Sequence, residues 1–437
     1  MSRDSKPESL IHLSARDMAR AVRAGQLTSE DLVTAHLARI AEREPSVGAW
    51  RFLDGARALS RAREADSLLA SGTAVGVLHG IPIGIKDVFD TSDMPSEYGS
   101  HLYQGRRPER DAAAVRVLRR AGAIIMGKTV TSEFGMYHPS VTRNPLDPAR
   151  SPGVSSSGSA AAVADHMVPL ALGTQHTAST LLPASFCGAF AFKPSFGFTD
   201  MSGSNVLAAR LAHVGFFARS VGDLAFFASA FDPPLRESEC LTAIPRLALA
   251  HGPGWHHAEA DSVQRLAGLI ESLPVQVHAV RWNIEFAAAL PLCVELLNVN
   301  LALRFKSQPQ EMLCEPLRAA VASGLAITLA RYEELNAEAD RLAQVADSVL
   351  EKYDALLSLS APGEATRLEE GPGSGALCMA WSLCGLPTVS LPLLTGRNGL
   401  PIGVQLIGRR GQDRHLLSVA SWLTRVAMGK DLGSQNV

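Results

Sequence analysis

The chain has few cysteines, and none stands in a metal-binding or disulfide pattern. Six cysteines are spread over 437 residues without a C-x-x-C pair and without a histidine at ligand spacing. This scattering argues against zinc and against a disulfide framework, so we expect buried, reduced thiols and neither a metal nor a cofactor. The six are Cys187, Cys240, Cys293, Cys314, Cys378 and Cys384.

The sequence also lacks an excess of charge of one sign and any long apolar run. Its 41 basic and 43 acidic side chains leave a formal net charge of −2 at pH 7. Nucleic acid backbones are bound by surfaces with a positive excess, so nucleic acid is not an expected partner. The polar N-terminus is not a secretory signal, and no stretch approaches the roughly 20 apolar residues of a membrane span. We therefore expect a cytoplasmic protein with no membrane partner.

Hydrophobic residues are plentiful, at 46% of the chain, which is enough to bury a large core. Helical patterns come first. Cap residues at Ser14 and Thr28 predict two helices between about residues 14 and 44, and a third is expected between Ala56 and Leu69. An N-terminal helical segment, residues 1–70, is therefore expected to pack on the core.

Strand and helix patterns alternate after this segment. Residues 80–90 and 123–128 are short apolar runs typical of strands buried on both faces, and a helical pattern at 112–122 separates them. This alternation predicts an α/β fold in which helices surround a central, mostly parallel mixed sheet within a single large domain. Further strands are expected at 168–174, 189–195, 354–362, 388–394 and 399–408.

Two loops rich in small residues carry the chemical signal. VSSSGS, from Val154 to Ser159, precedes a helical pattern, and GTQHTAS, from Gly173 to Ser179, follows a strand pattern. Small residues let backbone N–H groups converge on one point, as a developing oxyanion requires. Taken alone, however, a serine-rich loop is most often a solvated loop or a helix cap.

Their context resembles the amidase signature family over residues 25 to 425. Besides these loops, the resemblance includes GIPIGIKD around Lys86, CGLPTVSLP and GLPIGVQLIGR. It implies a Ser-Ser-Lys catalytic triad of Lys86, Ser155 and Ser179, whose separations of 69 and 24 residues are those expected for the family. It also implies one amidase signature domain over residues 71–430, with a helical, pocket-forming insertion at about 240–352.

The resemblance implies hydrolysis of a small-molecule amide through an acyl-enzyme on Ser179. Ser155 would relay the proton to Lys86, which acts as a base only when it is uncharged. The apolar residues around Lys86 provide the desolvation that lowers a lysine pKa. Without the motif, this lysine would be interpreted as a surface side chain at a strand end.

Several residues near the expected site depart from the family pattern. Thr177 and Ala178 replace glycines before the nucleophile, and Val154 and Ser157 replace glycines around the bridging serine. Backbone N–H groups of His176, Thr177 and Ala178 would still form the oxyanion hole, with added strain if Ala178 needs a positive φ. His176 itself is interpreted either as a packed, hydrogen-bonded side chain or as a second general base or substrate contact.

Five residues are candidates for substrate binding. They are Tyr137, Gln175, Leu181, Leu182 and Trp381. The family commonly has an arginine just after the nucleophile, but here leucines follow, so an apolar wall and a neutral or aromatic acyl group are expected. Trp381 is interpreted either as core packing or as part of the pocket.

Other functions remain open at this stage. The acyl group could pass to an amine instead of water, or a catalytically impaired member could act as a binding or scaffold subunit. Ammonia transfer within a tRNA-dependent amidotransferase complex is less favoured, because neutral charge and altered loops give no positive sign of it. A homodimer is also considered.

Overall fold

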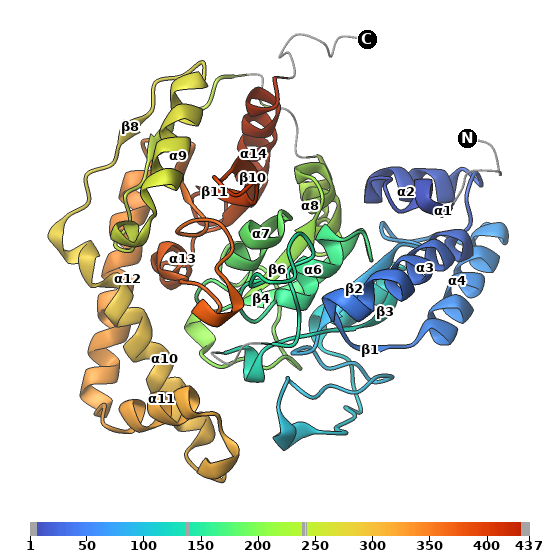
Figure 1. The fold of residues 1–437 in the computed structure, drawn as a ribbon, viewed down its shortest axis with the longest axis horizontal. Helices are drawn as coiled ribbons and strands as arrows, with labels where there is room; N and C mark the ends of the chain where they lie inside the picture. The colour runs from blue at the N-terminus through green and yellow to red at the C-terminus, as the bar shows by residue number, and fades with distance from the viewer. Residues whose placement is uncertain (1–6, 137–139, 238–240, 242, 430–437) are drawn as a thin grey trace.

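The computed structural model describes residues 7–136, 140–237, 241 and 243–429, and one 11-stranded sheet runs through its centre (Figure 1). The strand order is β1-β3-β2-β4-β6-β5-β10-β11-β9-β7-β8. The strands are β1 (Trp50–Leu53), β2 (Pro82–Lys86), β3 (Ile124–Thr129), β4 (Leu170–Gln175), β5 (Phe190–Lys193), β6 (His213–Ala218), β7 (Leu247–Leu249), β8 (His278–Ala279), β9 (Ala355–Leu359), β10 (Thr388–Thr395) and β11 (Pro401–Ile407).

Helices cover both faces of this sheet. They are α1 (Pro7–Leu10), α2 (Ala15–Arg23), α3 (Ser29–Val47), α4 (Gly55–Ala70), α5 (Ala113–Arg120), α6 (Ser157–Ala164), α7 (Leu181–Cys187), α8 (Val221–Ala228), α9 (Ala260–Ser272), α10 (Ala289–Phe305), α11 (Glu315–Leu325), α12 (Leu329–Leu350), α13 (Ala376–Leu383) and α14 (Asp413–Ala427). The α/β class and the mixed sheet predicted from the sequence are confirmed.

The expected predominance of parallel strands needs correction. In the described part of the chain, four neighbouring strand pairs are parallel and six are antiparallel. The strand-helix-strand pattern correctly indicates that β3, β2 and β4 run parallel. It fails where β6 inserts antiparallel between β4 and β5, and where β10 and β11 form a hairpin. A hairpin needs only a short loop, whereas a parallel pair needs a crossover.

The N-terminal segment follows its local capping signals. Ser14 accepts a hydrogen bond from the N–H of Asp17 at 3.0 Å, and Thr28 forms a capping box with Asp31 at the start of α3. The segment is not wholly helical, however, because β1 lies within it and pairs with β3. Its place at the sheet edge depends on a distant partner strand, which local patterning does not reveal.

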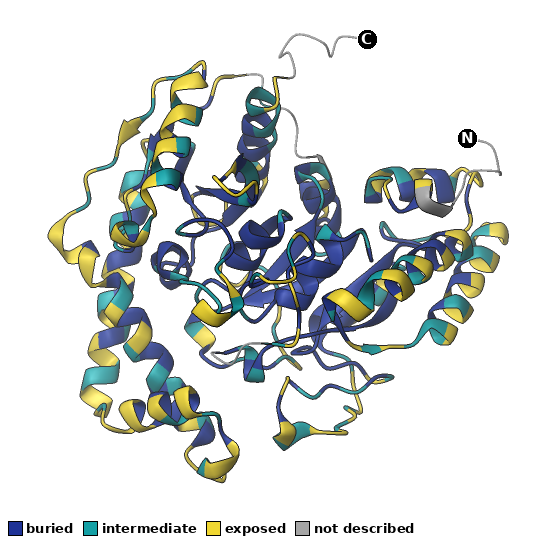
Figure 2. Cartoon of the chain, viewed as in Figure 1, coloured by how far each residue is buried: buried dark blue, intermediate teal, exposed yellow. Residues whose placement is uncertain are grey.

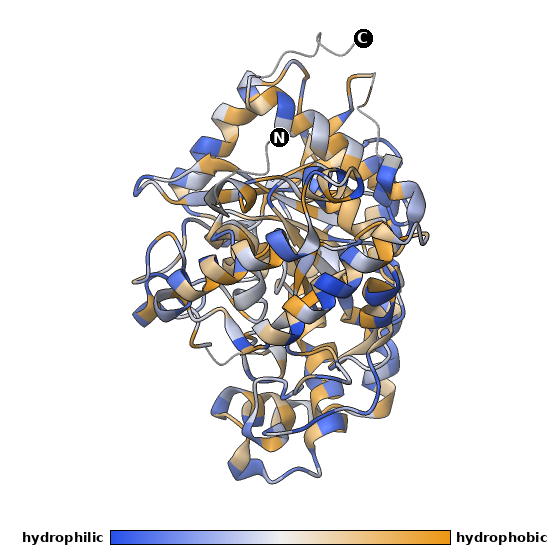
Figure 3. Ribbon diagram, turned by 90° about the vertical axis from the view of Figure 1, so that its right-hand side faces the viewer, coloured by the Kyte–Doolittle hydropathy of each residue, from blue (hydrophilic) through white to orange (hydrophobic). Residues whose placement is uncertain are grey.

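Alternation along the strands divides the core into two layers. Ile83 and Ile85 pack on one face, in a cluster that also draws on α2, α5, α8, α9 and α14. Ile124 and Met126 pack on the other face, against α3, α4, α6 and α7. Figure 2 shows the strands and central helices as buried and the outer helices as partly exposed, and Figure 3 shows these outer helices with mixed hydropathy.

A second core forms where α10, α11, α12 and α13 pack together. The segment Ile284–Phe305 has the length and apolar composition of a membrane span, with a mean hydropathy of 1.8, and half of it is buried inside the protein. The region expected as a helical insertion, 240–352, is mainly helical but also supplies β7 and β8 to the sheet. Its proposed boundaries stay a prediction.

Candidate active site

Lys86 is the last residue of β2 and is completely buried. Its Nζ lies 2.7 Å from the Oγ of Ser155, 2.9 Å from the Oγ of Ser156 and 3.0 Å from the Oγ1 of Thr174. Ser155 and Ser156 directly precede α6, and Thr174 belongs to β4, which pairs with β2. The parallel strands and the helix start therefore bring three hydroxyls to one amine.

Burial lowers the pKa of the Lys86 amine well below its ordinary value of 10.5, because desolvation penalises the ammonium form. Gly135, the last residue of the short helix η2 (Glu133–Gly135), lies beside the Lys86 amine and the Ser155 hydroxyl. A methyl group placed on Gly135 would stand 3.6 Å from the Oγ of Ser155 and 3.9 Å from the Nζ of Lys86. The position of a side chain at residue 135 thus borders the buried amine.

Ser179 lies in the loop between β4 and α7 and is 6% exposed. Within the described residues its hydroxyl makes no hydrogen bond, so the structure joins Lys86 to Ser155 but leaves the third member of the predicted triad unlinked. The backbone N–H groups of Thr177, Ala178 and Ser179 likewise donate no hydrogen bond to any described residue. Three successive donors at this loop are therefore free to bind an acceptor.

The loop that carries Ser179 is held by the side chain of Gln175, which is fully buried. Its Oε1 accepts the N–H groups of Thr180 at 2.9 Å and Leu181 at 3.1 Å, and its Nε2 donates to Ser382 at 2.9 Å. Ser382 in turn donates to the carbonyl of Thr177 at 2.8 Å. These bonds occupy the side chain that the sequence suggested for substrate contact.

Ala178, which replaces a family glycine, does not have the positive φ that would strain it. A methyl group placed on Gly375 would lie 2.5 Å from the Cβ of Ala178, so the glycine at 375 makes room for the larger residue. His176 accepts the N–H of Leu207 at its Nε2, 3.1 Å away. Burial lowers the His176 pKa to about 3, so this ring is neutral at physiological pH.

The remaining substrate-binding candidates lie in packed surroundings. Leu181 and Leu182 are fully buried in a small apolar cluster with Ala178 and Phe186. Trp381 is 1% exposed and lies 5.6 Å from the Trp282 ring and 5.8 Å from the Phe286 ring, measured between ring centroids. Tyr137 lies outside the described residues.

Metal-ligating side chains do not cluster in the part of the chain that the structure describes. Four of the cysteines, Cys187, Cys293, Cys378 and Cys384, are free and buried there, and Cys314 is free and half-buried. Cys240 lies outside the described residues.

Sequence analysis missed Ser156, Thr174 and Ser382 as parts of the site. Ser156 was visible beside Ser155 in the VSSSGS loop, and Thr174 in GTQHTAS, but nothing local indicates which hydroxyls reach Lys86. Ser382 is 207 residues from its partner Gln175. No local pattern could have paired them.

Comparison with known proteins places this geometry in a family. The Amidase family model matches residues 31–245 and 289–417. The chain is 31% identical over 467 residues to a glutamyl-tRNA(Gln) amidotransferase subunit of Symbiobacterium thermophilum, covering 93% of this chain and 95% of that one. It is 30% identical to the putative amidase AmiD of Mycobacterium bovis, covering 94% and 93%.

Solved structures agree with the sequence matches. A protein described as "Crystal structure of amidase" superposes with a TM-score of 0.86 at 28% identity, covering 94% of this chain and 99% of that one. The chain belongs to the amidase family, whose similar members include both amidases and amidotransferase subunits.

Proposed function

We propose that this protein hydrolyses the carboxylic amide of a small molecule through an acyl-enzyme on Ser179. The observation that carries the proposal is the contact between the Lys86 amine and the Ser155 hydroxyl at 2.7 Å, in a site where burial lowers the Lys86 pKa. An uncharged amine in contact with a hydroxyl is able to accept a proton. This is the base that a serine nucleophile needs.

The hydrogen bonds around Lys86 suit a neutral amine, which has two N–H donors and one lone pair. Ser156 donates its own proton to the carbonyl of Thr174 at 3.1 Å, so it accepts from Lys86. If Thr174 also accepts through its hydroxyl, both N–H donors are used. The lone pair is then left for the hydroxyl proton of Ser155.

The proposed reaction follows from this arrangement. When substrate binds, the oxygen of Ser179 attacks the amide carbon while its proton passes to Ser155 and the Ser155 proton passes to Lys86. The leaving amine takes a proton back from Ser155 as the C–N bond breaks. Water then attacks the acyl-enzyme along the same proton path and releases the acid. The free hydroxyl of Ser179 has to turn toward Ser155 only in the substrate complex, where catalytic hydrogen bonds tighten.

The oxyanion that forms on the substrate would be held by backbone N–H groups of the nucleophile loop, those of His176, Thr177 and Ala178. The free N–H groups described for Thr177 and Ala178 support this role. Donors that are already oriented in a site of low polarity stabilise developing negative charge strongly. His176 takes part through its backbone, since its ring is neutral and bonded to Leu207.

Labelling with a fluorophosphonate probe tests the nucleophile. We expect a covalent adduct on Ser179 in the wild-type protein, because the probe reacts with a serine that a neighbouring base activates. Intact mass and peptide mapping locate the adduct, and Ser179→Ala should remove it. The variant Ser374→Ala, which changes another serine in the loop facing Ala178, should label normally. A folded wild-type protein that stays unlabelled would instead favour the scaffold alternative.

The acyl group is expected to be neutral or aromatic. Leu181, at the position near the nucleophile where relatives carry a guanidinium, offers no cation to pair with a substrate carboxylate. We expect kcat/KM for an aromatic amide such as benzamide to exceed that for a malonamate-like amide by about tenfold or more. A preference for the carboxylated amide, measured by ammonia release, would contradict this expectation.

Transfer of the acyl group to an amine is the second candidate. The similarity over nearly the whole chain to a protein named as an amidotransferase subunit favours it. That similarity also leaves room for a partner subunit, and a homodimer stays a prediction. Adding hydroxylamine to the amide assay separates the two reactions, because a transferase forms hydroxamate in preference to acid at low acceptor concentration.

A further inference from the structure

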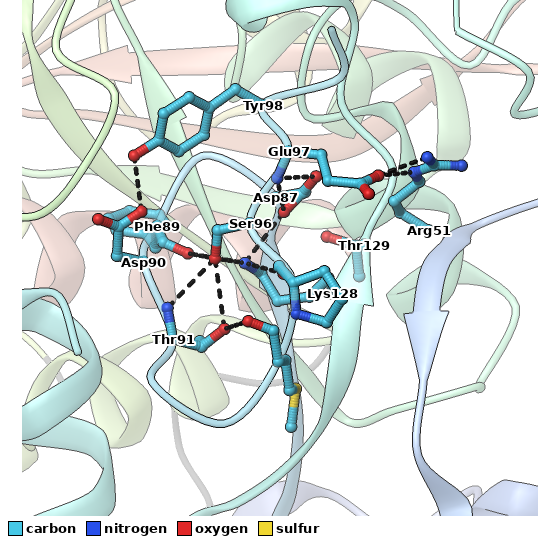
Figure 4. A network of polar contacts seen from close by, with 12 residues as sticks. Arg51, Asp87, Phe89, Asp90, Thr91, Ser96, Glu97, Tyr98, Lys128 and Thr129 are labelled. Carbon is cyan, nitrogen blue, oxygen red and sulfur yellow. Dashed lines mark hydrogen bonds and ion pairs between the residues drawn. The ribbon is translucent and has the colours of Figure 1, made fainter. Parts of the chain in front are cut away.

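A second buried lysine, Lys128, lies on β3, which pairs with the strand of Lys86. Figure 4 shows Lys128 and the polar groups around it. In the register of β2 and β3, Ile85 pairs with Lys128 and Lys86 pairs with Thr129. Because successive side chains on a strand alternate, Lys128 leaves the sheet on the face opposite to Lys86. There its Nζ lies 3.0 Å from the carboxylate of Asp87, the residue that follows Lys86.

The ion pair of Lys128 and Asp87 is fully enclosed. Their side chains are 0% and 1% exposed. The Nζ of Lys128 also donates to the Oγ of Ser96 at 2.7 Å and to the carbonyls of Phe89 at 2.8 Å and Pro95 at 3.2 Å. All three belong to the loop that follows β2, so a lysine on β3 holds this loop against the strand end that carries Lys86.

Further charged contacts fix the same loop. The carboxylate of Asp87 accepts the N–H of Glu97. Asp90 accepts two hydrogen bonds from Arg106, at 2.7 and 2.8 Å, and one from the hydroxyl of Tyr98 at 2.6 Å. We call residues 87–106, held by these contacts, the clamp loop. Figure 4 shows the carboxylate of Asp87 and the hydroxyl of Ser96 beside the amine of Lys128.

The clamp loop contacts the segment that lies beside the Lys86 amine, residues 133–135. The carbonyl of Tyr98 accepts the N–H of Phe134 at 2.7 Å, and the ring of Tyr103 lies edge-on to the ring of Phe134, with centroids 5.8 Å apart. Tyr98 and Phe134 both have positive φ, at 57° and 51°. Such strained backbone persists only where its surroundings hold it. The next residue is Gly135, whose side-chain position borders Lys86 and Ser155.

We propose that the Asp87–Lys128 pair positions the Lys86 amine and keeps it dry, by holding the clamp loop and, through Tyr98 and Phe134, the Gly135 backbone over it. Both residues act through others and touch no substrate. The inference rests on the proposed function only in naming Lys86 as the base. It adds positioning residues that the Ser-Ser-Lys arrangement does not contain.

The charged groups near Lys86 would not by themselves shift its pKa when the pair is removed. Asp87 and Lys128 neutralise each other, so removing both leaves the local net charge unchanged. His176, on the nucleophile loop, is neutral because burial lowers its pKa to about 3. Glu133, on η2, is engaged by the hydroxyl of Ser100 and the N–H of Cys314. The helix packed on this end of β2, α6, contains no charged residue. A change in Lys86 ionisation on removing the pair would therefore report hydration and geometry.

Titration of Lys86 itself provides the test. The chain has seven lysines, so the NMR spectrum of a protein labelled with 13Cε-lysine contains few lysine signals. The signal that is missing in Lys86→Met is that of Lys86. In Asp87→Asn/Lys128→Met both charges are removed, and asparagine keeps an oxygen for the N–H of Glu97. We expect the pH midpoint of the Lys86 titration to be higher than in the wild-type protein by about one unit or more, because water reaches the amine. The acid limb of the kcat/KM profile should move with it.

Controls separate positioning from general damage. Lys193→Met removes another fully buried lysine, on β5, and should leave the Lys86 midpoint unchanged, because Lys193 makes no contact with the clamp loop in the described part of the chain. If the double variant does not fold, Tyr98→Phe removes only the hydroxyl bond to Asp90 and should raise the midpoint by a smaller amount. A folded variant of either kind with the wild-type midpoint overturns the inference.

The same data distinguish this inference from the proposed function. If removing the pair shifts the Lys86 midpoint but the wild-type protein hydrolyses no amide, the positioning role stands and the proposed function is wrong. If the wild-type protein hydrolyses amides, but removing the pair changes neither the pH profile nor the Lys86 signal, the proposed function stands and the positioning role is wrong.

Discussion

Replacing Lys86 with methionine is expected to lower kcat/KM for any amide substrate by at least about a hundredfold and to make the protein more stable at pH 7. Activity falls because Ser155 loses the base that takes its proton. Stability rises because an amine that is costly to bury is replaced by an apolar chain of similar length. We expect a gain in the free energy of unfolding of about 1 kcal/mol, measured by chemical denaturation.

The pH dependence of this stability gain has a definite sign. Burial lowers the Lys86 pKa in the folded state, so between that pKa and the unfolded value of about 10.4 the unfolded chain binds the extra proton. Wild-type stability then rises with pH through this window, relative to the variant. The advantage of Lys86→Met should therefore be largest at and below the folded-state pKa of Lys86, and it should shrink as the pH rises toward 10.

Lys306→Met is the matched control, because it makes the same substitution at an exposed lysine. It should change neither kcat/KM nor the dependence of stability on pH. Near-normal turnover in Lys86→Met would contradict the assignment of the base. A variant that loses activity but is less stable at neutral pH would show instead that the three hydroxyl contacts outweigh the burial of the amine.

The elements nearest the site follow from local sequence signals. Apolar runs predict β2 and β3, and the caps at Ser14 and Thr28 begin the helices as expected. Lys86 was identified by the resemblance of its motif. Its environment was predicted from the flanking isoleucines, and burial of the amine agrees with that prediction.

The role of Lys128 could not be predicted from local sequence signals. It follows a strand pattern just as Lys86 does, and sequence analysis gave it no part in the site. Its partners are Asp87, the carbonyls of Phe89 and Pro95 and the hydroxyl of Ser96, so its burial depends on how a separate loop folds back. The short strands β1 and β8 were missed for the same reason, because pairing with a distant strand creates them.

Gln175→Leu is expected to lower the free energy of unfolding by about 3 kcal/mol and to lower kcat by tenfold or more. Leucine has a similar volume but no polar atoms, so the buried N–H groups of Thr180 and Leu181 lose their shared acceptor, and Ser382 loses its donor. Each buried group left unpaired costs about 1–3 kcal/mol. The loop before Ser179 would then lose the bonds that fix its N–H donors.

Gln175→Glu separates the hydrogen bonds from the rest of the side chain. A carboxylate still accepts from Thr180 and Leu181, and its negative charge suits the first turn of α7. It cannot donate to Ser382, although the Ser382 hydroxyl could turn and donate to it. Desolvation of the buried carboxylate lowers the stability of Gln175→Glu, so the comparison rests on activity. We expect Gln175→Glu to retain more activity than Gln175→Leu, as measured by initial rates on the folded proteins. Equal losses of activity in both variants would mean that the two backbone bonds do not hold the loop, and that the bond from Gln175 to Ser382 carries the effect.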